Sequence, residues 1–376
     1  MRGLKPTVLG FLVFSIWPWQ AQAIDARLLP EGVLRVRLYE SWYQGDQMYD
    51  PAGHRQPLGQ TGLDKLAGKG VPVAVANAYA IRNTAQYALQ RTDLSIDYGL
   101  SRNIDLGAWI PFLDPSLEQS TTLTRAGGWG ALPTAQQAVI AGAVAQLNGS
   151  DGEHRGLGDV FVGVKGRILG EQKARERFSL GGGVRLPTGH VANPLDPRDF
   201  STGDGQWDLS LWSWFDFQPG ETFFVNLHTR HDYGLSGSRD TQFPTDATRV
   251  GRMDFQPGLH HYVQLEPQWR VPLERVELQP SLFFIYDRQE RGKQQGFYPA
   301  QSAFVGPMLP AEGTDWQRLM FKPSLGVSFV PMGVPMALYL GVGKALWGKN
   351  TPEVSVVELR MDFFFETSSR PQGTSP

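Results

Sequence analysis

Residues 178–190, FSLGGGVRLPTGH, place three consecutive glycines beside an arginine and a Pro-Thr-Gly turn, a composition that could cradle a phosphate group. The spacing does not fit this chemistry. A dinucleotide fingerprint needs G-x-G-x-x-G, but Leu186 stands three residues after Gly183, and a P-loop needs Lys where His190 follows Gly189. Apolar residues alternate here as in a strand, so we predict a strand whose inward Gly181 and Gly183 leave room for a bulky neighbour, a loop or a solute.

The seven histidines could serve in catalysis or bind a metal. His260 and His261 are adjacent, so their side chains point to opposite faces of a strand, and the same holds for His228 and His231. A zinc site needs three or four convergent ligands. Because the histidine spacing supplies no such set, we predict no metal and no cofactor.

A lipid-modifying hydrolase with a Ser-His arrangement on its outer wall is the enzymatic alternative. Leu259 and Val263 occupy the positions two residues from His261 on its own face, so no serine stands there. A more distant serine stays open, because catalytic triads are defined by geometry and not by spacing. We do not expect an enzyme.

Charged residues of both signs occur in near balance on one face of the predicted strands, the face that would line a barrel. Such a set could form ion pairs that stiffen a narrow interior, or it could line a polar path. A strongly selective pore would carry an excess of one sign. The candidate lumen-lining residues are Arg35, Arg37, Asp97, Lys165, Arg167, Arg185, Asp208, Arg230, Glu266, Arg270, Lys322, Glu358 and Arg360.

Alternation of polar or small residues with apolar ones recurs along the whole chain and predicts about twelve strands. Examples are VLRVRLYESWY at 33–43, LSIDYGL at 94–100 and IDLGAWI at 104–110. These lengths are close to the roughly 9–11 residues with which a tilted strand crosses a bilayer.

The connections between these strands alternate between short links and long ones. The long ones cover roughly residues 44–90, 113–156, 188–205, 232–257, 288–316 and 347–353. Long loops are uncommon in compact soluble domains but typical of outer-membrane barrels, which have short periplasmic turns and long external loops. A β-sandwich or a propeller also has many short strands, but the sequence has no blade-length repeat. We predict an all-β fold, a single transmembrane antiparallel barrel.

Residues 134–149, TAQQAVIAGAVAQLNG, predict a short helix in the second long loop, ended by Asn148 and Gly149. This segment could narrow the barrel mouth, lie over its rim or remain a solvated loop, and the sequence leaves these placements open.

The first 23 residues read as a secretory signal peptide, with Arg2 and Lys5 before an apolar run and Ala21-Gln22-Ala23 before Ile24. An N-terminal membrane anchor is the alternative, but the run is well short of the ~20 residues of a spanning helix. We assign residues 24–365 to the barrel and 366–376 to a polar tail.

Composition limits the partners. The formal net charge of −2 offers no basic excess for nucleic acid. The absence of cysteine from the sequence excludes disulfides, thiolate metal centres and cysteine nucleophiles. We expect outer-membrane lipid and a small-molecule solute as partners, and the oligomeric state stays open.

Several stretches resemble a known family. Residues 156–169, 179–190 and 202–217 are similar to the strand–turn–strand–loop–strand core of the outer-membrane family named for the meta-pathway of phenol degradation. YDPAGHRQPLG at 49–59 and LSIDYGLSRNIDLGAWIPF at 94–112 resemble its early segments. The resemblance implies an outer-membrane barrel that passes small hydrophobic or aromatic compounds, and it carries over no binding residues. One departure is the polar tail after Phe365, where such barrels commonly end on an aromatic residue.

We therefore expect a channel in the outer membrane of a Gram-negative bacterium, through which small molecules diffuse passively. The alternatives are a lipid-modifying hydrolase and a closed structural or adhesive barrel.

Overall fold

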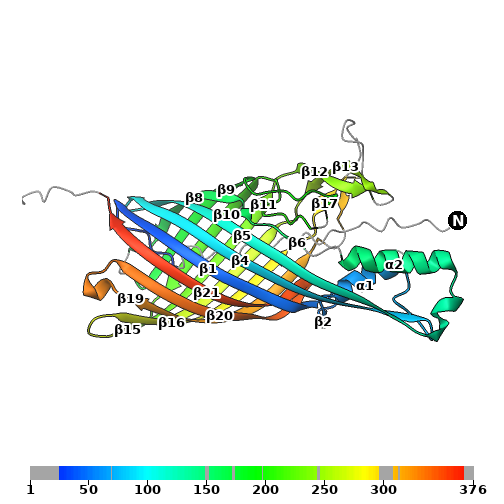
Figure 1. Cartoon of the computed structure of the whole chain (residues 1–376). Coiled ribbons are helices and arrows are strands. Elements are labelled where there is room, and N and C mark those ends of the chain that lie inside the picture. Colours follow the sequence, from blue (N-terminus) through cyan, green and yellow to red (C-terminus); the bar gives the residue numbers. More distant parts are fainter. Residues whose placement is uncertain are drawn as a thin grey trace, which may run out of the picture.

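The computed structural model describes residues 25–68, 70–148, 152–171, 174–196, 198–243, 246–295, 308–311 and 314–367. Within them, twelve long antiparallel strands form a closed barrel (Figure 1). The barrel strands are β1 (Val33–Tyr49), β4 (Tyr79–Ser101), β5 (Ile104–Arg125), β8 (Val160–Leu169), β9 (Glu176–Leu186), β10 (Asp208–Phe217), β11 (Phe223–Gly234), β14 (His260–Trp269), β16 (Glu277–Gln289), β19 (Trp316–Ser328), β20 (Met336–Lys349) and β21 (Thr351–Glu366).

Each barrel strand pairs with its neighbours in chain order, and β21 closes the sheet against β1. The closing register runs from Val33↔Glu366 to Tyr49↔Thr351. Side-chain exposure alternates as the sequence predicts: on β10 the apolar Leu209 and Leu211 are exposed, whereas Asp208 and Ser210 are buried. Apolar residues outside and polar residues inside are typical of a barrel that faces lipid. The predicted fold class is confirmed.

The two ends of the barrel differ in their connections. At the turn end, strands are joined by the short links 102–103, 170–175, 218–222, 270–276 and 329–335. At the loop end, the links 50–78, 126–159, 187–207, 235–259 and 290–315 are long. The predicted alternation of short and long links is confirmed except for the last one. Residues 347–353 are a tight turn instead of a loop, because only Asn350, with a φ of 49°, separates β20 from β21.

Strands β4 and β5 are much longer than the predicted 94–100 and 104–110. Their register extends from Ser101↔Ile104 to Tyr79↔Arg125, so part of the predicted loops 44–90 and 113–156 is strand. Large apolar residues alternate along this extension of β4, at Tyr79, Ile81, Tyr87 and Leu89, but they lie on the buried face that also carries Arg91 and Asp93. Leu94 and Ile96 lie on the opposite face, so the apolar face of the strand changes and the predicted pattern ended there. The two-stranded ribbon that β4 and β5 form outside the barrel projects beyond the loop end (Figure 1).

Two helices lie beside this ribbon: α1 (Gln60–Gly68) and α2 (Thr134–Asn148) (Figure 1). The predicted helix 134–149 is confirmed as α2, and α1 was not predicted. Ile140 and Ala143 of α2 pack with Leu66 of α1 and with Tyr79 and Ile81 of β4 in one buried apolar cluster. Packing on the ribbon was not among the placements that the sequence left open, and the structure shows α2 packed there. No helix among the described residues has the length and apolarity to cross a membrane.

The remaining elements are short. They are β2 (Arg55–Pro57), β3 (Ala74–Val75), η1 (Gly127–Ala131), β6 (Gly152–Glu153), β7 (Gly156–Leu157), β12 (Gly237–Phe243), β13 (Asp246–Gln256), β15 (Val271–Pro272), β17 (Lys293–Gln294), β18 (Leu309–Pro310) and η2 (Val330–Met332). Strands β12, β13, β17 and β18 form a separate small sheet.

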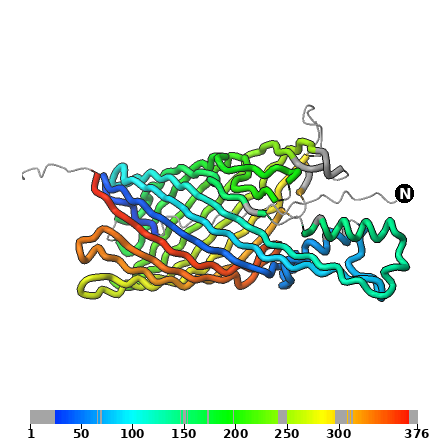
Figure 2. Tube along the Cα trace, viewed as in Figure 1, coloured from blue at the N-terminus to red at the C-terminus, as the bar shows by residue number. Residues whose placement is uncertain are grey.

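Residues 25–32, which we call the inner segment, run inside the barrel at the turn end before β1 begins (Figure 2, dark blue). Gly32, with a φ of 79°, reverses the chain there, and its N–H donates to the carbonyl of Gly99 on β4 at 2.9 Å. A side chain at Gly99 would collide with the carbonyl of Pro30, so the close approach of the inner segment requires glycine. The predicted signal peptide 1–23 lies outside the described residues, as does all of the predicted tail 366–376 except Glu366 and Thr367.

Candidate functional site

Five aromatic side chains meet inside the barrel: Tyr39 on β1, Trp109 on β5, Phe161 on β8, and Trp212 and Trp214 on β10. We call them the aromatic cluster. All five are buried, and Ala26 of the inner segment packs with them. The ring centroids are 5.3 Å apart for Tyr39 and Trp109, 4.5 Å for Phe161 and Trp212, and 5.7 Å for the two tryptophans. Four strands from one half of the chain thus contribute aromatic rings to one place in the interior.

Inward glycines make room for these rings. A Cβ at Gly181 would lie 3.0 Å from Trp212 and 2.9 Å from Trp214, and a Cβ at Gly163 would lie 2.8 Å from Trp212. A Cβ at Gly183 would overlap the ring of Phe161. The predicted space beside Gly181 and Gly183 is therefore filled by a bulky neighbour, the aromatic cluster.

A cavity of about 490 Å³ adjoins the aromatic cluster, and its volume includes space open to solvent. Trp109, Phe161, Trp212 and Trp214 form its apolar side, and its polar lining includes Arg37, Asp97 and Lys165. Sites for small molecules combine mainly apolar walls with a few fixed polar groups. The cavity has a lining of this kind, which suits a small amphipathic or aromatic molecule.

Most of the predicted lumen-lining residues face inward and form ion pairs. The Asp97 carboxylate lies 2.7 Å from Arg37 and 3.3 Å from Arg35. The distances are 2.7 Å for Lys322 and Glu358, 3.1 Å for Arg360 and Asp362, and 2.5 Å for Arg230 and Asp232. Arg185 contacts Asp208 and also Asp159 and Asp204. Because a buried charge is costly without a partner, this pairing accounts for the balance of signs.

Lys165 differs from the other inward cations because its hydrogen-bond acceptors belong to the inner segment. Its Nζ donates to the carbonyls of Asp25 at 2.6 Å and Arg27 at 2.9 Å, and it lies 4.6 Å from the ring centroid of Trp214. The same stretch is held from two further strands: the Ala26 N–H donates to Asp216 at 2.8 Å, and Ser179 Oγ donates to the Ala26 carbonyl at 2.6 Å. The inner segment is thus fixed beside the cavity and narrows the turn end.

Three predicted lumen-lining residues have other surroundings. Arg167 donates to the carbonyl of Arg102 at the β4–β5 turn, at 2.6 Å. Arg270, just after β14, lies 3.7 Å from Glu277 and 4.1 Å from the ring centroid of Phe224. Arg167 and Arg270 therefore belong to the rim of the turn end. Glu266 is deeply buried and accepts a long hydrogen bond of 3.5 Å from Asn226.

Neighbouring histidine side chains on β11 and β14 point to opposite faces of the barrel wall, as the sequence predicts. His260 is buried inside, 2.9 Å from Asp232 and 2.6 Å from Asp287. His261 lies on the other face, with its Nδ1 2.9 Å from Nδ1 of His231. The sequence analysis did not identify Trp212 and Trp214 as interior residues. Both lie at even-numbered positions of β10, as the inward Asp208 and Ser210 do. This alternation is the sequence signal that identifies the two tryptophans as inward-facing.

The closed twelve-stranded sheet, apolar outside and ion-paired inside, has the fold of outer-membrane β-barrel proteins. An outer-membrane channel from Pseudomonas putida F1 is similar to this chain, with a TM-score of 0.53 at 16% identity, covering 93% of this chain and 100% of the channel. A monoaromatic hydrocarbon channel, CymD, gives a TM-score of 0.35 at 10% identity over 90% of each chain. No family model and no curated protein matches the sequence.

Proposed function

We propose that this protein is an outer-membrane channel through which small molecules diffuse passively. The long loops lie outside the cell, and the turn end faces the periplasm. The observation that carries the proposal is the amphipathic cavity inside a closed barrel, which is lined by four rings of the aromatic cluster and by Arg37, Asp97 and Lys165. A purely structural barrel has no need of such a cavity.

The proposed solute is a small molecule with an aromatic or hydrophobic body. Indole and phenyl rings attract other rings in stacked or edge-to-face arrangements, and each such pair contributes about 0.5–1.5 kcal/mol beyond area burial. Arg37 and Lys165 can donate hydrogen bonds to a polar group of the same molecule. Because the inner segment narrows the turn end, a solute that moves from the cavity to the turn end passes this segment.

Conductance across a planar lipid bilayer tests the proposal. Detergent-purified, tag-free protein should give stepwise currents, and small aromatic solutes should interrupt these currents while they occupy the cavity. Trp212→Ala should shorten the interruptions, because it removes one side of the cavity. Trp42→Ala is the matched control, since Trp42 is exposed on the outer face of the barrel. The absence of both conductance and solute-driven liposome swelling would contradict the channel.

The neighbours of His261 argue against the hydrolase alternative. Among the described residues, its side-chain partners are His231, at 2.9 Å, and Glu290, at 3.5 Å, and neither is the serine that a Ser-His arrangement requires. Incubation with phospholipid or lipopolysaccharide should therefore release no fatty acid. Release that disappears in His261→Ala would favour the hydrolase.

A further inference from the structure

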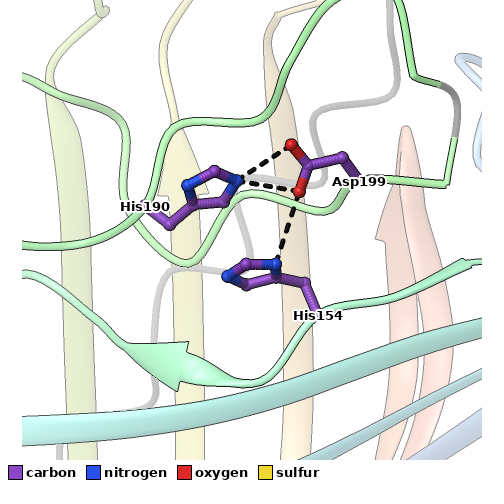
Figure 3. A group of neighbouring side chains, drawn as sticks. All are labelled: His154, His190 and Asp199. Atoms are coloured by element: carbon purple, nitrogen blue, oxygen red, sulfur yellow. Dashed lines mark hydrogen bonds and ion pairs between the residues drawn. The ribbon is translucent and has the colours of Figure 1, made fainter.

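Three side chains from two loops converge at the loop end. His154 belongs to the link 126–159, between β6 and β7, and His190 and Asp199 belong to the link 187–207 (Figure 3). Nε2 of His190 lies 2.8 and 2.9 Å from the two carboxylate oxygens of Asp199, and Nδ1 of His154 lies 3.4 Å from one of them. One ligand atom from each residue lies within 4.8 Å of the others. The imidazoles stack with centroids 4.1 Å apart.

These donor types select a class of ion. Two imidazole nitrogens and one carboxylate suit borderline divalent cations such as Zn²⁺, Ni²⁺ and Cu²⁺. Ca²⁺ and Mg²⁺ prefer sets made only of oxygen ligands. Three protein ligands leave a coordination position for water.

The backbone that carries both imidazoles is fixed before any ion binds. The N–H of His154 donates to the carbonyl of Pro115 on β5 at 3.3 Å, and β6 and β7 on either side pair with β5. The N–H of His190 donates to Thr202 Oγ1 at 3.0 Å. Thr202 Oγ1 in turn donates to the carbonyl of Leu157 at 2.7 Å, which joins the two loops. These hydrogen bonds hold the two histidine backbones near one another, and affinity gains from such preorganisation.

The carboxylate has its own support. Oδ2 of Asp199 accepts a hydrogen bond from the N–H of Asn193 at 2.7 Å. A partner that orients a ligand in this way strengthens a metal site.

We propose that His154, His190 and Asp199 bind one borderline divalent cation, and that this ion clamps the link 126–159 to the link 187–207 at the loop end. The three residues lie apart from the lining of the interior cavity. The site is therefore independent of the proposed channel function, and either proposal can fail without the other.

Calorimetric titration of tag-free, chelator-treated protein with ZnCl₂ tests binding. We expect one ion per chain. His190→Ala and Asp199→Asn should each weaken binding by at least about tenfold, because even the loss of an outer partner costs about that much. His54→Ala is the matched control, since His54 is exposed on another loop and pairs with Asp50 at 3.4 Å. The absence of saturable binding would overturn the site. Binding unchanged in His190→Ala would also overturn it, because the ion would then lie elsewhere, for example at His231 and His261.

Two further measurements identify the ligands and the clamp. Cu²⁺ bound to the protein should show electron paramagnetic coupling to two imidazole nitrogens, and to one in His154→Ala. Coupling unchanged in His154→Ala would overturn its role as a ligand. Zn²⁺ should slow tryptic cleavage after the exposed Arg155 and Arg198 in the unaltered protein but not in His190→Ala. Cleavage that Zn²⁺ does not affect would overturn the clamp. A shift in gel mobility on boiling confirms that each variant still forms the barrel.

Discussion

At the scale of single residues, the interior depends on pairing small residues with large ones on neighbouring strands. Gly183 lies opposite Gly163 on β8 and opposite Ser210 on β10, and the ring of Phe161 covers it. The adjacent Gly182, on the outer face, has a single close neighbour, the carbonyl of Ser210, for an added Cβ. The glycines of residues 181–183 therefore have different roles although they are consecutive.

Gly183→Ala should destabilise the barrel by about 1–3 kcal/mol, because the added methyl group overpacks the wall against Phe161 and the carbonyl of Val162. The measurement is the urea concentration at which purified protein in detergent unfolds. Gly166→Ala is the matched control, since its Cβ would meet only ordinary contacts, at 3.8 and 3.9 Å. Equal midpoints for the two variants would contradict this role of Gly183.

At the scale of elements, the inner segment contributes no strand yet touches β4, β5, β8, β9 and β10. The N–H of Leu29 donates to the carboxylate of Asp105 on β5 at 3.0 and 3.2 Å, and Lys165 on β8 holds two carbonyls of the segment. The inner segment is therefore held in place by buried polar contacts and not by pairing with a strand of the sheet.

Lys165→Met should raise the single-channel conductance. It removes two charge-assisted hydrogen bonds worth about 1.5–3 kcal/mol each, and every 1.4 kcal/mol lost raises the population of released segment about tenfold. Planar bilayer recording is the measurement. Lys344→Met provides the comparison, because Lys344 is exposed on β20 and pairs with Glu353 at 3.1 Å. Currents no larger than those of the unaltered protein would show that the segment does not limit passage.

The barrel strands and the helix α2 were predictable because their signals are local. Alternation with period two marks a strand that separates lipid from a polar interior, and the stretch TAQQAVIAGAVAQLN marks a helix. The convergence of Trp109, Phe161 and Trp212 was not predictable, since it depends on the registers of four strands. His154, His190 and Asp199 were missed for a similar reason: they come from irregular loops, and no spacing rule connects them.

At the scale of the whole molecule, the interior carries both signs of charge in close pairs. Arg37 with Asp97, Lys322 with Glu358 and Arg360 with Asp362 each cancel most of the field that either partner alone would impose on a passing ion. Strong selectivity requires an excess of one sign along the path.

The current through the proposed channel should therefore discriminate weakly between cations and anions. The measurement is the reversal potential in a KCl gradient, and we expect a value close to zero. Glu358→Gln should shift it toward anion selectivity, because Lys322 then loses its acidic partner. If the reversal potential of the unaltered protein were close to the value for perfect selectivity, either for K⁺ or for Cl⁻, this balance of charges would be contradicted.

The position of the inner segment also constrains the order of assembly. Its contact between Ala26 and Asp216 joins residues 190 positions apart, so it can form only after β10 is in place. β1 follows this segment directly and is also the strand that closes the sheet against β21. The inner segment therefore docks late, and the pairing of β1 with β21 that closes the barrel is late as well. Both steps bring together residues that are far apart in the sequence, and such long-range contacts form slowly. A chain that sealed first would have to thread this stretch through the narrow opening at the turn end.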